Sequence, residues 1–218
     1  MTLGFKKIND MKTFNKEIQD ATSPVDALNL LKEGNKRFVA AKVADRDLLN
    51  QVKDTTGGQW PHSVVLSCID SRVPAEIVFD QGIGDIFSAR VAGNIVNEDV
   101  LGSIEYGCKV AGSKLVVVLG HTMCGAVKGA CDDVQLGNIT ALLSKIRPAV
   151  HATTHPEEAS ERTSANKTFV NDVVTKNVHM TIEKMRNDSP LLKEMEEAGD
   201  IKIVGGVYDI SNGEVLFM

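Results

Sequence analysis

Short runs rich in β-branched residues alternate along the chain with longer amphipathic stretches. The runs are residues 63–68, 85–91, 114–120 and 201–208. Runs of this length and apolarity are typical of strands that helices cover on both faces of a parallel sheet. A turn at 211–213 precedes a last apolar segment, 214–218, which we interpret as an edge strand. The pattern predicts an α/β fold with a mainly parallel central β-sheet, about four parallel strands plus a C-terminal edge strand, flanked by helices.

The intervals between these runs contain signals that begin and end helices. Ser23 can cap a helix that starts at Pro24, and Asp26 places a negative charge near its N-terminus. Further helices are expected over 97–112, 123–131 and 137–149. Apolar residues spaced by three or four then mark one face of a long helix, which 187–190 ends before a shorter one begins: Val170, Val174, Val178, Ile182 and Met185.

The N-terminal part of the chain differs from the rest. Residues 1–22 are polar and show no apolar period, so we expect an arm outside the core. We divide the chain into an N-terminal helical arm, 1–42, and a single α/β domain, 43–218, whose first strand follows a glycine-rich linker. A length of 218 residues suits one such domain with a sizeable core.

Composition argues against several classes of function. The net charge is −5 and the Lys and Arg residues are scattered, which is not the pattern of a nucleic-acid partner. The longest apolar run is too short to span a membrane, and the N-terminus lacks the apolar core of a signal peptide. We therefore expect a cytoplasmic protein without a membrane partner. In that compartment the four cysteines are expected to serve metal binding, catalysis or packing.

Two of the cysteines and one histidine fall where strands end. Cys68 ends the first strand, His121 follows the third, and Cys124 begins the next helix. Because ligand sites in parallel α/β sheets gather beyond the carboxyl ends of strands, we expect these side chains at one edge. Two thiolates and one imidazole form a set that Zn²⁺ favours. Three protein ligands leave a fourth position for water or substrate, as in catalytic zinc sites.

The residues after Cys68 bear on the choice between a metal site and ordinary packing. Asp70 and Arg72 follow at alternate positions, where Asp70 can bind the metal or pair with Arg72. Spacing alone is equally compatible with a structural cysteine beside an exposed ion pair. The other cysteines do not complete a four-ligand site, since Cys131 lies two turns along its helix and Cys108 is interpreted as a core residue.

The segments "CIDSRVPAE" (68–76) and "GHTMCGAVKG" (120–129) resemble the two signatures of the β-class carbonic anhydrases. Other segments from about residue 25 onward are similar to the family in the expected order. The resemblance implies reversible hydration of CO₂ to bicarbonate and a proton, with Zn²⁺ as cofactor and zinc-bound hydroxide as nucleophile.

The same resemblance implies a role for each signature residue. Cys68, His121 and Cys124 would hold the zinc. Asp70 and Arg72 would form a dyad that orients the hydroxide and gates the site. When the two are paired, the fourth zinc position is open to water; when they separate, Asp70 binds the metal and closes it.

A substrate pocket is implied as well. Gln59 stands where plant-like members of the family have a glutamine that hydrogen-bonds bicarbonate, and Val65 replaces the tryptophan of the bicarbonate-inhibited subgroup. Both residues favour the plant-like subgroup. Other substrate-binding positions, partly contributed across a dimer interface, are Phe87, Ala92 (where valine is more usual), Tyr106 and Gly125.

By the same resemblance the arm wraps a neighbouring subunit, so we expect a homodimer or a homotetramer. Two other functions stay open: a hydrolase acting on CS₂ or carbonyl sulfide with the same zinc site, and a non-catalytic zinc scaffold. The remaining histidines are expected to be structural or solvated. His62 is interpreted as a surface residue rather than a proton shuttle, His151 and His155 as parts of a loop, and His179 as partly buried.

Overall fold

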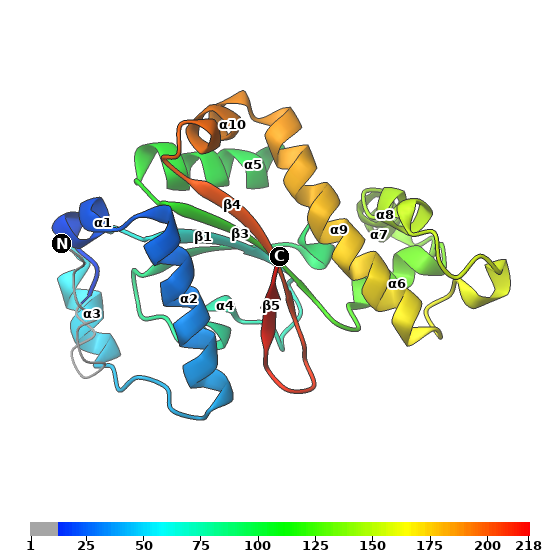
Figure 1. Cartoon of the computed structure of the whole chain (residues 1–218), viewed down its shortest axis with the longest axis horizontal. Helices are drawn as coiled ribbons and strands as arrows, with labels where there is room; N and C mark the ends of the chain where they lie inside the picture. The colour runs from blue at the N-terminus through cyan, green and yellow to red at the C-terminus, as the bar shows by residue number, and fades with distance from the viewer. Residues whose placement is uncertain (1–12) are drawn as a thin grey trace.

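The structure, a computed structural model, describes residues 13–218, so the expected arm lies in part, at 1–12, outside the described residues. Its centre is a five-stranded sheet in the order β2-β1-β3-β4-β5 (Figure 1). Four strands run parallel, and the short β5 pairs antiparallel with β4. The predicted fold class is therefore confirmed, including the C-terminal edge strand. The strands are β1 (Ser63–Ser67), β2 (Ile86–Arg90), β3 (Leu115–His121), β4 (Lys202–Tyr208) and β5 (Val215–Phe217).

Helices cover both faces of this sheet (Figure 1). One face packs against α2 (Pro24–Val39) and α4 (Ala75–Val78), with Leu31 and Phe79 in the shared core. The other packs against α5 (Glu98–Glu105), α9 (Lys167–Asp188) and α10 (Pro190–Glu197). Every residue of β1 and β3 is buried. The sequences of both strands therefore contain continuous apolar runs without the alternation of polar and apolar residues that a half-exposed strand shows.

A third apolar cluster lies beyond the carboxyl edge of the sheet. It joins α6 (Gly125–Cys131), α7 (Gly137–Leu143), α8 (Arg147–Ala152) and the first half of α9, and it includes Cys68 and Cys124. The long helix α9 runs past this cluster and along the sheet (Figure 1). Its predicted apolar face is confirmed, since all five residues that marked it are buried.

Three local expectations need correction or addition. The single helix expected over 137–149 is two helices, α7 and α8, because Pro148 has no N–H for a continuing helix and lies instead in the first turn of α8. The linker contains α3 (Leu48–Asp54), capped by Asp47 and too short to show a period. In the described part of the arm, α1 (Lys16–Ala21) buries Gln19, which donates to the Pro61 and Ala111 carbonyls at 2.9 and 2.8 Å.

The expectation of a surface position for His62 is wrong. This side chain is fully buried at the amino end of β1, the edge opposite Cys68. Its Nδ1 lies 2.7 Å from Ser63 Oγ and its Nε2 lies 3.0 Å from Gln81 Oε1. Burial lowers the pKa of His62 from 6.5 to about 4. The residue is therefore a neutral core group, remote from the carboxyl edge of the sheet.

This burial predicts how stability depends on pH. Below pH 6.5 the unfolded chain protonates His62, whereas the folded chain keeps it neutral down to about pH 4. The contribution is complete above pH 6.5 and falls by about 3 kcal/mol as the pH drops to about 4. Urea unfolding of the wild type and of His62→Gln at several pH values from 4 to 7 measures this contribution. The free energy of unfolding should depend less steeply on pH in the variant than in the wild type. The same pH dependence in both proteins would contradict the assignment of His62 as a neutral buried group.

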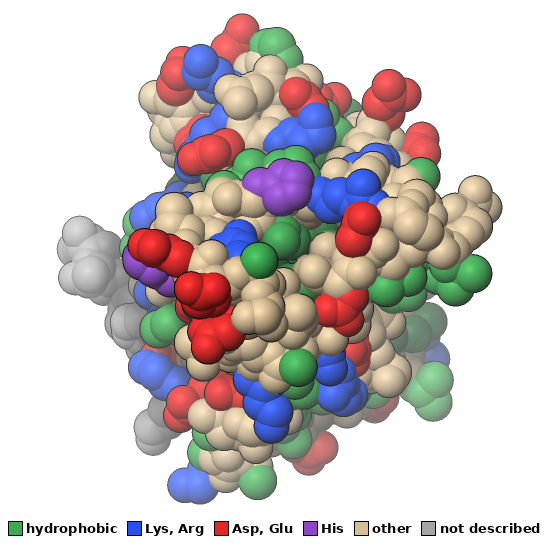
Figure 2. All heavy atoms as spheres, turned by 90° about the vertical axis from the view of Figure 1, so that its right-hand side faces the viewer, with side chains coloured by type: hydrophobic (Ala, Val, Ile, Leu, Met, Phe, Trp, Pro, Cys, Tyr) green, Lys and Arg blue, Asp and Glu red, His purple; other side chains and the backbone are tan. Residues whose placement is uncertain are grey.

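The surface is mixed in charge where Figure 2 displays it. Acidic and basic side chains are interspersed on this face, in keeping with their scatter along the sequence. None of the helices within residues 13–218 has the length and apolarity that crossing a membrane requires.

Candidate metal centre

Three side chains able to bind a metal converge at the carboxyl edge of the sheet. Cys68 directly follows β1, His121 is the last residue of β3, and Cys124 is the N-cap of α6. Their ligand atoms all lie within 4.8 Å of one another, and all three residues are buried. Because β1 and β3 are paired neighbours, cysteines 56 positions apart in sequence bring their sulfur atoms to 3.9 Å. The predicted convergence is therefore observed.

The imidazole of His121 is oriented as a ligand. Its Nδ1 lies 3.1 Å from the Thr122 carbonyl oxygen, an atom that can only accept, so Nδ1 carries the proton. The other nitrogen, Nε2, is then an unprotonated acceptor. It is buried and has no hydrogen-bond partner among residues 13–218. A buried lone pair without a partner is costly, and a metal ion would satisfy it.

The two thiols influence each other strongly. The hydrogen bond from Cys124 is the main cause that lowers the pKa of Cys68, and the Gly93 N–H, 3.4 Å from the sulfur, acts in the same direction. The same hydrogen bond, together with burial, raises the pKa of Cys124. One negative sulfur is thus stabilised beside a second that resists ionisation. A divalent cation would stabilise both thiolates at once.

This donor set fits Zn²⁺. Two sulfurs, each about 2.3 Å from a tetrahedral ion, are expected about 3.8 Å apart. The sulfur–sulfur distance of 3.9 Å agrees with that spacing. Two thiols and one imidazole are also the ligand types that zinc prefers, and three protein ligands are the number found in catalytic zinc sites.

Asp70 and Arg72 form a bidentate pair at the rim of the cluster. Arg72 Nε donates to Asp70 Oδ1 at 2.9 Å, and Nη2 donates to Oδ2 at 2.7 Å. The Arg72 backbone N–H also donates to Oδ1, at 3.0 Å. These contacts hold the pKa of Asp70 well below its usual range, so the carboxylate is ionised. The same Oδ2 lies 3.8 Å from His121 Nε2, which places this carboxylate beside the metal ligands.

Arg90 is a neighbour of the site to which sequence analysis assigned no role. Its Nε donates to the Cys68 carbonyl at 2.9 Å and its Nη2 donates to the Asp70 carbonyl at 2.6 Å. One guanidinium therefore holds the backbone on both sides of Ile69. The available sequence signal was its position at the end of β2, where side chains reach the same edge as Cys68.

Two of the predicted substrate-binding residues lie close to the cluster. Ala92 begins a short 3₁₀ turn, η1 (Ala92–Asn94), in which the next residue, Gly93, donates its N–H to Cys68. Gly125 is the first residue of α6, directly after Cys124, and a Cβ there would meet nothing within 4 Å. Both positions are thus next to a metal ligand in the chain.

The other predicted substrate residues lie elsewhere in the same chain. Phe87 pairs with Val64, four residues before Cys68 along β1, or about 13 Å at strand spacing. Its ring meets Tyr106 edge-on at 6.3 Å, and both line a hollow of about 650 Å³ beside β2 and α5. Gln59 is exposed in the loop before β1, at the opposite edge of the sheet.

The remaining cysteines and histidines fall outside the cluster. Cys108 is buried, which raises its pKa to about 12 and agrees with its interpretation as a core residue. It lies in a π-helical turn, η2 (Tyr106–Val110), that continues α5. His179 is exposed, so the expectation of partial burial is wrong. His151 and His155 are exposed as expected, although His151 belongs to α8 rather than to a loop.

Known proteins resemble this chain over most of its length. A family model described as carbonic anhydrase matches residues 63–215. Carbonic anhydrase 2 of Mycobacterium tuberculosis is 36% identical over 196 residues, which cover 89% of this chain and 93% of that protein. The carbonic anhydrase of Mycolicibacterium smegmatis is 35% identical over 195 residues, with the same two coverages, 89% and 93%.

Solved structures share the fold. A structure from a study of two tetrameric β-carbonic anhydrases of the filamentous ascomycete Sordaria macrospora matches with a TM-score of 0.69 at 26% identity, covering 77% of this chain and 85% of that one. The chain therefore belongs to the carbonic anhydrase family, in its β class. The predicted enzyme class, carbonic anhydrase, is confirmed with it. Membership of the plant-like subgroup stays a prediction.

Proposed function

We propose that this protein catalyses the reversible hydration of CO₂ to bicarbonate and a proton, with Zn²⁺ held by Cys68, His121 and Cys124. The observation that carries the proposal is the unpartnered Nε2 of His121 in a buried cluster with two sulfurs 3.9 Å apart. When bound there, Zn²⁺ lowers the pKa of a water molecule enough to make it a nucleophile near neutral pH.

Asp70 orients the attacking water. Its carboxylate is ionised and can only accept hydrogen bonds, so it takes one from the water and turns an oxygen lone pair toward the carbon of CO₂. Arg72 fixes the carboxylate through two parallel hydrogen bonds. If this pair separates, the same carboxylate can become a metal ligand and exclude water. The Asp70–Arg72 pairing supports the open arrangement for this chain.

A second subunit completes the substrate pocket. Phe87 lies about 13 Å along the sheet from its own chain's cluster, Tyr106 packs against Phe87, and Gln59 precedes β1 at the opposite edge of the sheet, which supports a role for them at a partner's cluster. A homodimer in which the hollow beside β2 faces the partner's metal centre brings them to CO₂ or bicarbonate, beside Ala92 and Gly125. The Sordaria relatives are described as tetrameric, which supports a homo-oligomer.

The N-terminal segment 1–42 contributes to that assembly. In its described part, Val25 of α2 is 56% exposed. In the following segment, Leu49 of α3 is 76% exposed, and Val43 between the two helices is 57% exposed. Exposed aliphatic side chains along residues 25–49 support burial of this part of the chain against a partner. We place the contact between subunits there and along β2.

The reaction rate should rise with pH. The thiolates of Cys68 and Cys124 cancel the charge of a dication, so the nucleophilic water loses its proton at a higher pH than in a three-histidine site. Asp70 does not titrate in this range, because Arg72 keeps its pKa low. Stopped-flow CO₂ hydration between pH 6.5 and 9 should show kcat increasing through this interval. A flat profile would argue against the two-thiolate site.

The choice of substrate is tested by direct comparison. Purified protein with measured zinc content is assayed for CO₂ hydration and for hydrolysis of CS₂ and carbonyl sulfide. We expect CO₂ hydration with kcat/KM well above that for either sulfur compound. The reverse order would favour the alternative hydrolase, and zinc-replete protein inactive on all three would favour a zinc scaffold. The ionised Asp70 beside the ligands supports catalysis, because a purely structural site does not require it.

A further inference from the structure

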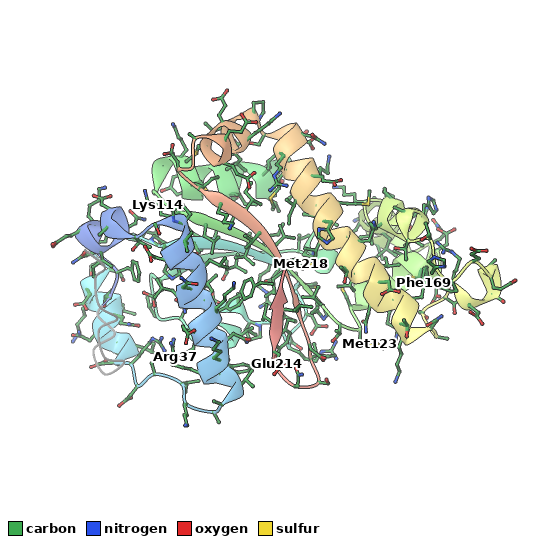
Figure 3. The ribbon with its side chains drawn as sticks, viewed as in Figure 1. Arg37, Lys114, Met123, Phe169, Glu214 and Met218 are labelled. Carbon is green, nitrogen blue, oxygen red and sulfur yellow. The ribbon has the colours of Figure 1, made fainter. Side chains whose placement is uncertain are left out.

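Two asparagines of α9 are bonded to the loops that supply the metal ligands. Asn177 is 3% exposed, and its Nδ2 donates to the Gly93 carbonyl at 2.9 Å. Asn171 lies six positions earlier, and its Oδ1 accepts the Met123 N–H at 3.1 Å. Figure 3 shows Met123 beside the N-terminal half of α9, in the loop that leads into α6. Neither asparagine belongs to the cluster itself.

The bond from Asn177 acts on Gly93, a residue whose N–H contacts a metal ligand. Gly93 has a φ of 71° and donates its N–H to Cys68 Sγ at 3.4 Å. A Cβ at this position would lie 2.5 Å from Ile146 Cδ1, and this crowding together with the positive φ favours glycine in the turn. A glycine peptide has wide freedom of rotation. Its carbonyl therefore needs a fixed hydrogen-bond donor if the turn is to present the Gly93 N–H to the sulfur, and the Asn177 amide provides that donor.

The bond from Asn171 acts between the other two ligands. Met123 lies between His121 and Cys124 in the chain. Its φ of 57° is unfavourable for a residue that has a Cβ. Accepting its N–H offsets part of this cost and fixes the direction in which the chain enters α6. The sulfur of Cys124 is positioned by that entry.

We propose that Asn177 and Asn171 are positioning residues of the metal centre, through which α9 fixes the Cys68 sulfur by way of Gly93 and the Cys124 sulfur by way of Met123. The inference rests on the zinc site proposed above. It assigns to α9, a helix that supplies no ligand, control over how tightly and in what geometry the cluster holds zinc. Partners that orient metal ligands typically change metal affinity by about 10- to 100-fold when they are removed.

The test compares Asn177→Leu and Asn171→Ala with wild type and with Thr181→Val, a buried control on the same helix. Zinc release to a chromophoric chelator should be about 10-fold or more faster in Asn177→Leu, and faster in Asn171→Ala. Thr181→Val should release zinc at the wild-type rate. In the Co²⁺-substituted proteins, the sulfur-to-cobalt charge-transfer band of Asn177→Leu should move to longer wavelength. The reason is that the Cys68 thiolate loses its hydrogen bond from the Gly93 N–H when Gly93 is no longer held. Asn171 is only half-buried, so its variant decides the question if Asn177→Leu does not fold.

A merely structural role predicts a different pattern. Lower melting temperatures with wild-type zinc release and an unshifted cobalt band in the asparagine variants would overturn the proposal. Equal acceleration in Thr181→Val would overturn it as well. Wild-type zinc content is measured alongside: wild-type protein that binds zinc while the asparagine variants behave normally refutes this inference alone. Wild-type protein that binds none refutes the proposed function with it.

Discussion

Replacing Cys124 with alanine is expected to abolish zinc binding and to reduce CO₂ hydration more than about 10³-fold, to a rate close to that of the uncatalysed reaction. Cys124 supplies one of the two sulfurs in the cluster, and the remaining pair, Cys68 and His121, would leave zinc with two protein ligands, one fewer than catalytic zinc sites have. The variant should also melt at a lower temperature than the zinc-loaded wild type, because a ligand that binds only the folded state stabilises it.

Cys131→Ala is the matched control. This cysteine lies at the other end of the same helix, is half-buried, and takes no part in the cluster. Zinc content by atomic absorption and stopped-flow hydration should be unchanged in Cys131→Ala and lost in Cys124→Ala. Retention of stoichiometric zinc and full activity in Cys124→Ala would exclude the proposed ligand set.

The second large effect concerns Asp70. Asp70→Asn should keep about one zinc per chain and lose about 100-fold in kcat/KM, since the amide cannot form the same charged pair with Arg72. Arg72→Ala should also keep zinc but release the carboxylate toward the metal ligands, 3.8 Å away from Nε2 of His121. Its activity should therefore be lost most completely at low pH, where hydroxide competes least with the carboxylate.

Asp200→Asn, an exposed substitution in the loop before β4, serves as the control for a lost surface charge. Zinc content and CO₂ hydration of all three variants are measured from pH 6.5 to 9. If Asp70→Asn has wild-type kcat/KM with zinc bound, the orienting role of this carboxylate is wrong. If it loses zinc, Asp70 acts mainly as a structural support of the cluster.

The sequence predicted those helices and strands whose pattern of apolar residues matches their burial in the fold. β1 and β3 are buried throughout and therefore contain continuous apolar runs, whereas α9 buries one face and shows the apolar spacing of a helix. The helices missed or merged are short: α3 spans seven residues, and α8 begins where Pro148 interrupts the expected helix. His62 was misread because polar residues are usually exposed, while here Ser63 and Gln81 satisfy both ring nitrogens inside the core.

The metal cluster could be predicted because strand ends of a parallel sheet share an edge: Cys68 and His121 occupy such ends, and Cys124 begins the helix that follows β3. The residues that support the metal ligands could not be predicted from the sequence. Arg90 and Asn177 donate to backbone carbonyls, and such contacts leave no spacing signature in the sequence; for Arg90 only its place at the end of β2 was informative. Gln59, Phe87 and Tyr106 were assigned by family resemblance, and their role in substrate binding rests on the proposed dimer.

Zinc K-edge X-ray absorption on the zinc-loaded wild type tests the central claim most directly. A single tetrahedral ion bound by Cys68, His121 and Cys124 should give two sulfur scatterers at about 2.3 Å and two nitrogen or oxygen scatterers at about 2.0 Å, one of them exchangeable solvent. A shell of four sulfurs, a shell without sulfur, or no stoichiometric zinc in metal-replete protein would contradict it.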